Sequence, residues 1–328
     1  MKKLKICLGL AVSIVCVVFL VLRIDFNTFT LYFNSVNIKF LILGGALILL
    51  NFCLHAIRWQ FLIVPQTLHF MKAFTYLMIG TFVNVILPFR PGDVLRIVLI
   101  QKLFSKNASI AAIGSITVER LFDLLTLLLF GVILAFIIPL PVTFKVMLNG
   151  FALFAAAIIT ALICLCINDQ IFKKLFFVIL KPFGIVFTSK VINIFDQFYL
   201  NIRTITSLNC LLITALLSFI SWACVAFSMV CFVAAFDPNI SVMAGILLMV
   251  VTNLGAAIPA SPGSIGVYHA LCVLTLSLWN VDYEKSLAIA IVSHTAIISI
   301  QVIGGIVSIW FEGGFSKVSS YSIKTSCN

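Results

Sequence analysis

The sequence predicts an all-α polytopic membrane protein, with about six transmembrane helices and two further apolar segments that are broken by proline and glycine. The first observation is composition: of 328 residues, 63% are hydrophobic and 9% are charged, and the mean hydropathy is +1.25. A soluble domain is about 45–50% apolar and about 25% charged. The second observation is a series of apolar runs of about 20 residues, the length that crosses a bilayer as a helix. Composition therefore excludes a soluble enzyme or a soluble binding domain.

Six apolar runs are long enough to cross the bilayer, namely 6–22, 39–57, 108–138, 146–167, 209–235 and 285–311. The first run follows a basic N-terminus, a pattern that is also found in secretory signal peptides. No small-x-small cleavage site follows it, so we expect an uncleaved first span. We expect Trp59, Trp279 and Trp310, which lie near predicted span ends, to be interfacial anchors.

Two other apolar segments, 73–101 and 241–279, are interrupted by turn-forming residues. The breaks contain Pro88, Pro91 and Gly92 in the first segment, and Pro259, Pro262, Gly263 and Gly266 in the second. Proline stops a helix and glycine permits a sharp reversal. Each segment could form two thin spans or one re-entrant hairpin. Counting Lys and Arg favours re-entrant hairpins, because most basic residues and both termini then lie on the cytoplasmic side of the cytoplasmic (inner) membrane.

The two breaks share a pattern of T-x6-P-x-x-P-G-x-[VI], which begins at Thr81 and at Thr252. A span, a broken hairpin and a span, repeated in opposite orientation, is typical of transporters with inverted repeats. The sequence therefore predicts one domain over 1–328, with 39–138 and 209–311 as inverted repeats. The alternative is chance recurrence of a common breaker in an apolar chain. Residues 168–208 would form a cytoplasmic amphipathic connection at the membrane interface.

Charge and cysteine usage limit the classes of partner. The formal net charge is +11, and most basic residues lie in short loops, where they orient the chain and contact anionic headgroups. No basic patch interleaved with aromatics predicts nucleic-acid binding. The ten cysteines contain no C-x-x-C pair, so we interpret them as small buried apolar residues. The sequence predicts no metal and no cofactor, and its expected partners are membrane phospholipids, anionic or aminoacylated, with a homo-oligomer left open.

Glu119, Arg120 and Asp123 lie near the middle of the run 108–138. Ionisable groups at that depth cost at least about 2.5–3.5 kcal/mol each on insertion scales. Arg120 and Asp123 are three residues apart and can pair. The cluster carries one excess negative charge, so another positive group or a shared proton is needed. It is either a structural ion-pair knot or the lining of a polar cavity for a headgroup or proton.

Arg90, Asp93 and Arg96 surround the first break. Exposed helix-end amides beside two arginines make a plausible phosphate site. The alternative is that both arginines extend to cytoplasmic headgroups. Four further polar groups are secondary candidates: Asn84 precedes the first break, His55 and Arg58 belong to a stripe on the second span, and His269 follows the second break. Such stripes commonly hold helices together.

The motifs together resemble the transmembrane, flippase-like region of lysylphosphatidylglycerol synthase and the stand-alone membrane proteins built on it. The resemblance covers nearly the whole chain. The residues that carry it are Arg58-Trp59, then Asn84, Pro88, Arg90, Gly92, Asp93 and Arg96, then Glu119, Arg120 and Asp123, and finally Pro259, Pro262, Gly263, Ile265 and Gly266. The family usually has Glu where Asp93 stands, Gly where Ser264 stands, and Arg-Glu where Tyr268 and His269 stand.

The resemblance implies translocation of a lipid between leaflets. The chain stops at Asn328, soon after the last span, so we expect translocation without lysyl transfer and no enzymatic activity. Two alternatives remain open at this point. One is a membrane-embedded transferase acting on a lipid headgroup or polyprenyl phosphate, for which Asp93 and His55 are the best pair. The other is a membrane partner subunit of a separate synthase.

Overall fold

A computed structural model gives the architecture of the chain. It describes residues 26–34, 36–63, 67–87, 90–104, 108–167, 199, 207–255 and 262–314. The predicted first span, 6–22, and nearly all of the predicted connection at 168–208 lie outside these residues, as do Pro88 and Pro259.

The elements of the described residues are helical throughout, which confirms the all-α prediction. They are α2 (Phe26–Asn34), α3 (Ile38–Leu62), α4 (Phe70–Ile86), α5 (Pro91–Leu103), α6 (Ala108–Ile137), α7 (Val142–Ile167), α10 (Leu208–Ala234), α11 (Val242–Gly255), the short 3-10 turn η2 (Pro262–Ser264), α12 (Val267–Leu276), the 3-10 turn η3 (Ser277–Trp279) and α13 (Tyr283–Phe311). Helices α3, α6, α7, α10 and α13 coincide with five of the six predicted runs.

Four of the described helices are long and apolar enough to cross a membrane, namely α3, α6, α10 and α13. Their outward faces carry exposed large apolar side chains, among them Phe136, Leu216 and Ile303. In a membrane protein such faces contact lipid tails rather than water. Shorter apolar stretches occur at 70–86, 142–158, 242–255 and 267–279.

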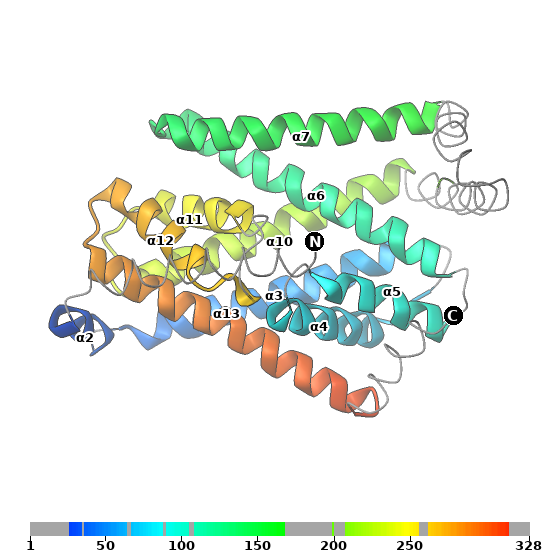
Figure 1. Ribbon diagram of the computed structural model, residues 1–328, viewed down its shortest axis with the longest axis horizontal. Helices are drawn as coiled ribbons and strands as arrows, with labels where there is room; N and C mark the ends of the chain where they lie inside the picture. Colours follow the sequence, from blue (N-terminus) through cyan, green and yellow to red (C-terminus); the bar gives the residue numbers. More distant parts are fainter. Residues whose placement is uncertain are drawn as a thin grey trace, which may run out of the picture.

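Helices α3 and α10 form the most extensive helix–helix contact and cross the centre of the molecule (Figure 1). A small residue permits the close approach, because a Cβ on Gly44 would lie 2.7 Å from the Phe232 ring. Ser228 of α10 donates a hydrogen bond of 2.8 Å to the Gly44 carbonyl. Small and hydroxyl residues at contacts of this kind are typical of membrane helices.

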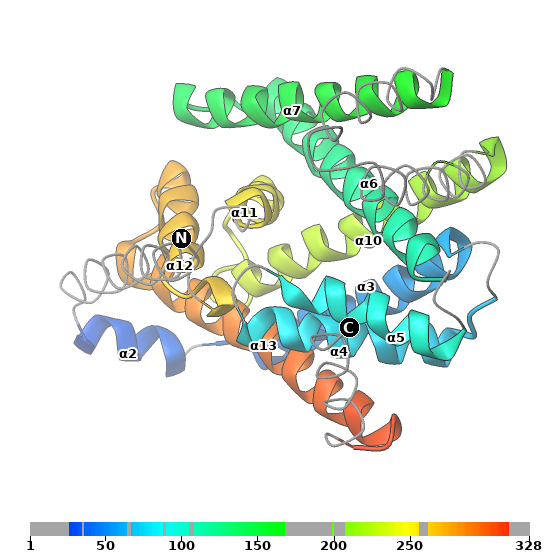
Figure 2. The same cartoon turned by 45° about the vertical axis from the view of Figure 1, so that its right-hand side comes forward.

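Helices α4 and α5 lie side by side as a tight helical hairpin (Figure 2). Gly80 and Gly92 face each other across it, and a Cβ on Gly92 would collide with the Gly80 carbonyl oxygen. The Gly92 amide donates to the Asn84 side-chain oxygen at 2.7 Å, which satisfies one of the free amides at the start of α5. Arg90 precedes α5 with φ 53°, in the left-handed region.

The second break returns the chain from α11 through η2 into α12. Gly263 and Gly266 have positive φ values of 65° and 89°, which only glycine adopts without strain. Turn η2 packs against α4 of the first hairpin. A Cβ on Gly263 would lie 3.8 Å from the Val85 carbonyl oxygen and 3.5 Å from Ile298 of α13. The two breaks therefore lie next to each other in space.

The helix contacts fall into matching sets. The contacts of α3 with α4, of α4 with α5 and of α5 with α6 recur as those of α10 with α11, of α11 with α12 and of α12 with α13. The contact of α4 with α13 likewise corresponds to that of α11 with α6. Helix α7 packs mainly on α6 and lies at the edge of the molecule in both views (Figures 1 and 2).

Candidate functional site

Six charged side chains from α3, α5 and α6 meet in one network inside the helix bundle. Three are arginines and three are acids: Arg58, Arg96, Arg120, Asp93, Glu119 and Asp123. Asp123 lies near the midpoint of α6, a helix long enough to cross the membrane. Charges at this depth need close partners, because the desolvation penalty is several kcal/mol for each unpaired ion.

Arg96 and Glu119 form the buried centre of the network. Both side chains are 1% exposed, and the guanidinium donates two hydrogen bonds, of 3.1 and 3.0 Å, to the two carboxylate oxygens. The Arg96 guanidinium also lies 4.1 Å from the centre of the Trp59 ring. Trp59 in turn donates its indole N–H to Ser115 Oγ at 3.0 Å. The pair is therefore held from α3, α5 and α6 at once.

Arg58 and Asp123 form the second buried pair, which joins α3 to α6 and α10. The Arg58 Nη1 atom donates to Asp123 Oδ1 at 2.7 Å and to Ser218 Oγ at 2.7 Å. Trp222 of α10 donates its indole N–H to the same Asp123 oxygen at 3.0 Å. The Asp123 carboxylate is thus fixed by a charged and a neutral donor, as buried carboxylates require.

Arg120 and Asp93 form the outer edge of the network. The Arg120 Nη2 atom lies 3.0 and 3.2 Å from the two Asp93 oxygens. The side chains of Arg120 and Asp93 are 37% and 19% exposed, whereas the other four members are at most 9% exposed. Arg120 also reaches Asp123 at 3.4 Å, which confirms the pairing predicted from their spacing. This edge is where a ligand could reach the network.

Arg90 stands beside this edge, at the first break. It is exposed, and its carbonyl accepts a hydrogen bond of 3.3 Å from the Asp93 amide. Among the described residues, no ion pair or side-chain hydrogen bond engages its guanidinium. Its left-handed backbone is unfavourable for arginine, and more so directly before Pro91. Strained residues of this kind cluster at functional sites.

The network as a whole is neutral, with three positive and three negative groups. The sequence indicated an excess negative charge on α6 and hence a need for a further positive group. Arg58 and Arg96 supply that charge from α3 and α5, while Asp93 adds the third acid. No shared proton is needed to balance these six groups.

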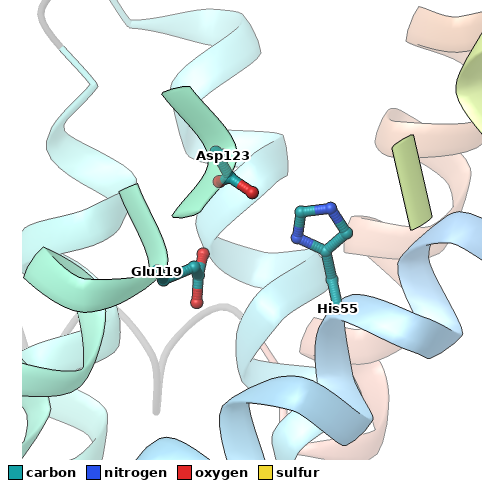
Figure 3. A group of neighbouring side chains, drawn as sticks. All are labelled: His55, Glu119 and Asp123. Carbon is teal, nitrogen blue, oxygen red and sulfur yellow. The ribbon is translucent and has the colours of Figure 1, made fainter. Parts of the chain in front are cut away.

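His55, Glu119 and Asp123 converge closely enough to raise the question of a metal site, since one potential ligand atom of each lies within 4.8 Å of the others (Figure 3). The neighbours argue against it. Arg58 Nη2 lies 3.2 Å from His55 Nδ1, and because arginine can only donate, that nitrogen accepts. Both carboxylates are already bound to arginines. A cation would have to displace these contacts and would meet the positive charge of Arg58.

At the second break, aromatic and imidazole rings replace the charges. Tyr268 stacks on His294 with ring centres 4.3 Å apart, and His269 meets His294 edge-on at 5.0 Å. The Gly266 amide donates to His269 Nδ1 at 3.3 Å, which closes the first turn of α12. His269 therefore supports the turn, as a hydrogen-bonding partner of the break.

The structure brings together all six principal candidate residues of the sequence except Arg90, which lies beside them. Three secondary candidates also join: Arg58 as a full member, His55 through Arg58, and Asn84 through its amide nitrogen, which lies 3.5 Å from Asp93 Oδ1. Sequence reasoning missed Ser218 and Trp222, for which it had no signal beyond their position on an apolar span. The prediction that Trp59 is an interfacial anchor is wrong, because Trp59 is fully buried. Helix α3 continues past this residue, and its ring packs against the Arg96 guanidinium.

The described residues form helices, four of them long enough to cross a membrane, with a buried ionic network between them, and these features define a polytopic integral membrane protein. The family model described as the lysylphosphatidylglycerol synthase TM region matches residues 6–305. The chain therefore belongs to this family.

A curated relative extends the comparison. The chain is similar to the UPF0104 membrane protein MJ1078 of Methanocaldococcus jannaschii, with 25% identity over 215 residues. The match covers 64% of this chain and 85% of the relative. No solved structure matches the chain.

Proposed function

We propose that this protein translocates phospholipids between the leaflets of the cytoplasmic membrane, as a flippase-like transporter rather than an enzyme. The headgroup would pass between the two breaks while the acyl chains stay in the bilayer. Helices α4–α5 and α11–α12 would be re-entrant hairpins, and both chain termini would lie in the cytoplasm.

One observation carries the proposal: within the described part of the chain, the network is exposed mainly at Arg120 and Asp93, next to Arg90, whose guanidinium has no described partner. Arg96 and Glu119 are too deeply buried to contact a headgroup, so we assign them to holding Arg120 and Asp93 in place. Arginine binds phosphate oxygens with two parallel donors. Arg90 and Arg120 are therefore the residues we assign to the headgroup phosphate.

The matching helix contacts support the inverted repeat that this mechanism uses. In transporters with inverted repeats, the substrate site lies where the broken helices of the two halves meet. Here η2 packs against α4, which brings the two breaks together. If the two repeats exchanged conformations, the passage between the breaks would open to one side of the membrane or to the other.

The transferase alternative finds less support in the side-chain geometry. A general base must be free to reach a substrate proton. The Asp93 carboxylate accepts two hydrogen bonds from Arg120, and His55 Nδ1 accepts from Arg58. Both groups named for such chemistry are thus engaged within the network.

Leaflet exchange of headgroup-labelled phospholipids in proteoliposomes tests the proposal. We expect Arg120→Gln to slow exchange at least about tenfold, the effect of about 1.4 kcal/mol on a rate. Lys145→Gln is the matched control, because it removes one positive charge from the exposed start of α7. Exchange at the wild-type rate by folded Arg120→Gln protein contradicts the mechanism. No exchange by wild-type protein rejects the transporter and favours a partner subunit of a separate synthase.

A further inference from the structure

The charge of the preferred headgroup can be read from the groups at the two breaks. In the network, every carboxylate has an arginine nitrogen within about 3 Å: Asp123 has Arg58 at 2.7 Å, while Glu119 and Asp93 have Arg96 and Arg120 at 3.0 Å. A cationic headgroup would have to take a carboxylate from one of these arginines. It would then leave Arg58 or Arg96 buried without a partner, which is strongly unfavourable, or separate Arg120 from Asp93.

At the first break, the side chains that remain free to bind a ligand are positively charged. Arg90 is exposed and unpaired among the described residues, and Arg120 is the most exposed member of the network. The two guanidinium groups carry like charges at the same edge, since the Asp93 amide donates to the Arg90 carbonyl at 3.3 Å and the Asp93 side chain contacts Arg120 at 3.0 Å, and like charges repel each other. An anion placed between them removes this repulsion and gains charge-assisted hydrogen bonds.

The second break offers nothing to a cation either. Residues 238–281 contain no Asp, Glu, Lys or Arg. Its polar side chains are neutral or already engaged, since His269 Nδ1 accepts from Gly266 and Tyr268 pairs with Ser293 at 3.0 Å. Two other described acids are tied to lysines at helix ends, where Asp237 contacts Lys285 and Glu312 contacts Lys72.

Resting on the proposed function, we infer that the lipid recognised at these breaks has an anionic headgroup whose phosphate charge is not offset by an aminoacyl ammonium group. The phosphate binds Arg90 and the exposed side of Arg120, which keeps its contact with Asp93. Phosphatidylglycerol has the required charge. Lysylphosphatidylglycerol, with a net positive headgroup, does not.

Equilibrium binding to the full chain in detergent tests this inference, with short-chain phosphatidylglycerol and lysylphosphatidylglycerol of the same acyl length as probes. We expect phosphatidylglycerol to bind at least about tenfold more tightly, the scale of one charge-assisted hydrogen bond. Arg90→Gln should remove most of this preference, whereas Lys145→Gln should leave it intact. Equal or tighter binding of the lysyl lipid, or an Arg90→Gln variant with the full preference, overturns the inference.

Two further measurements complete the test. One distinguishes a lipid phosphate from free phosphate as the ligand, and the other distinguishes failure of the anionic preference from failure of the proposed translocation. Inorganic phosphate should bind far more weakly than the lipid, and equal binding would reassign the site to free phosphate. Selective binding without leaflet exchange supports the anionic site and rejects translocation. Faster exchange of the lysyl lipid than of phosphatidylglycerol supports translocation and rejects the anionic preference.

Discussion

Arg58 shows how a residue gains its role from partners far away in the sequence. It has no exposed surface, and it contacts Asp123 on α6 and Ser218 on α10. The sequence placed it on a polar stripe with His55, which indicates a face but not what lies opposite. The excess negative charge on α6 did predict that a positive group must come from elsewhere. Helical spacing could not identify Arg58 and Arg96 as that group, because partners across a helix bundle depend on tertiary packing.

The buried pair Arg96–Glu119 leads to a prediction at the residue scale. Arg96→Met leaves Glu119 with only the longer contacts, 3.7 Å to Arg120 and 3.9 Å to Arg58. We expect a loss of about 3–5 kcal/mol in the free energy of unfolding, the usual cost of breaking a buried pair. The measurement is reversible unfolding in mixed micelles.

The double variant Arg96→Met/Glu119→Leu is the control for this prediction. It removes both charges and fills the space with apolar atoms, so it should be clearly more stable than Arg96→Met alone. A double variant whose destabilisation equals the sum of the two single variants would show that the side chains do not interact.

At the scale of elements, hydropathy was sufficient to locate the helices. The runs at 39–57, 108–138, 146–167, 209–235 and 285–311 match α3, α6, α7, α10 and α13 to within a few residues. Proline and glycine also marked where the two shorter segments break. The sequence could not predict how closely α4 and α5 approach, because this depends on Gly80 lying opposite Gly92.

The glycine contact between α4 and α5 gives a prediction for these elements. In Gly92→Ala the added methyl group meets the Gly80 backbone, which cannot rotate away as a side chain could. Overpacking of this kind costs about 1–3 kcal/mol, so the thermal midpoint in detergent should fall. Gly150→Ala on α7 is the control, since no atom lies within 4 Å of its added Cβ, and it should have an unchanged or slightly higher midpoint. Equal midpoints for the two variants would mean that the hairpin is looser than described.

For the whole molecule, the repeated break motif led to an inverted-repeat layout, and the matching contacts around α3 and α10 are those expected of two similar halves. The sequence held no information on how the two broken segments sit against each other. The structure packs η2 onto α4, so the two breaks lie next to each other although three predicted spans separate them in the chain. The two breaks differ in charge, with arginines at one and rings of tyrosine and histidine at the other.

If headgroups pass between the two breaks, a reversible cross-link that holds the breaks together should block their passage. Cysteines would replace Val85 and Ser264, which lie where α4 meets η2, in a background without the ten native cysteines. After reaction with a short thiol-cleavable cross-linker, leaflet exchange in proteoliposomes should stop, and it should return when the link is reduced. Each single-cysteine variant, treated in the same way, should exchange at the starting rate. Undiminished exchange by fully cross-linked protein would rule out passage between the breaks, because the lipid would then take a route that does not separate them.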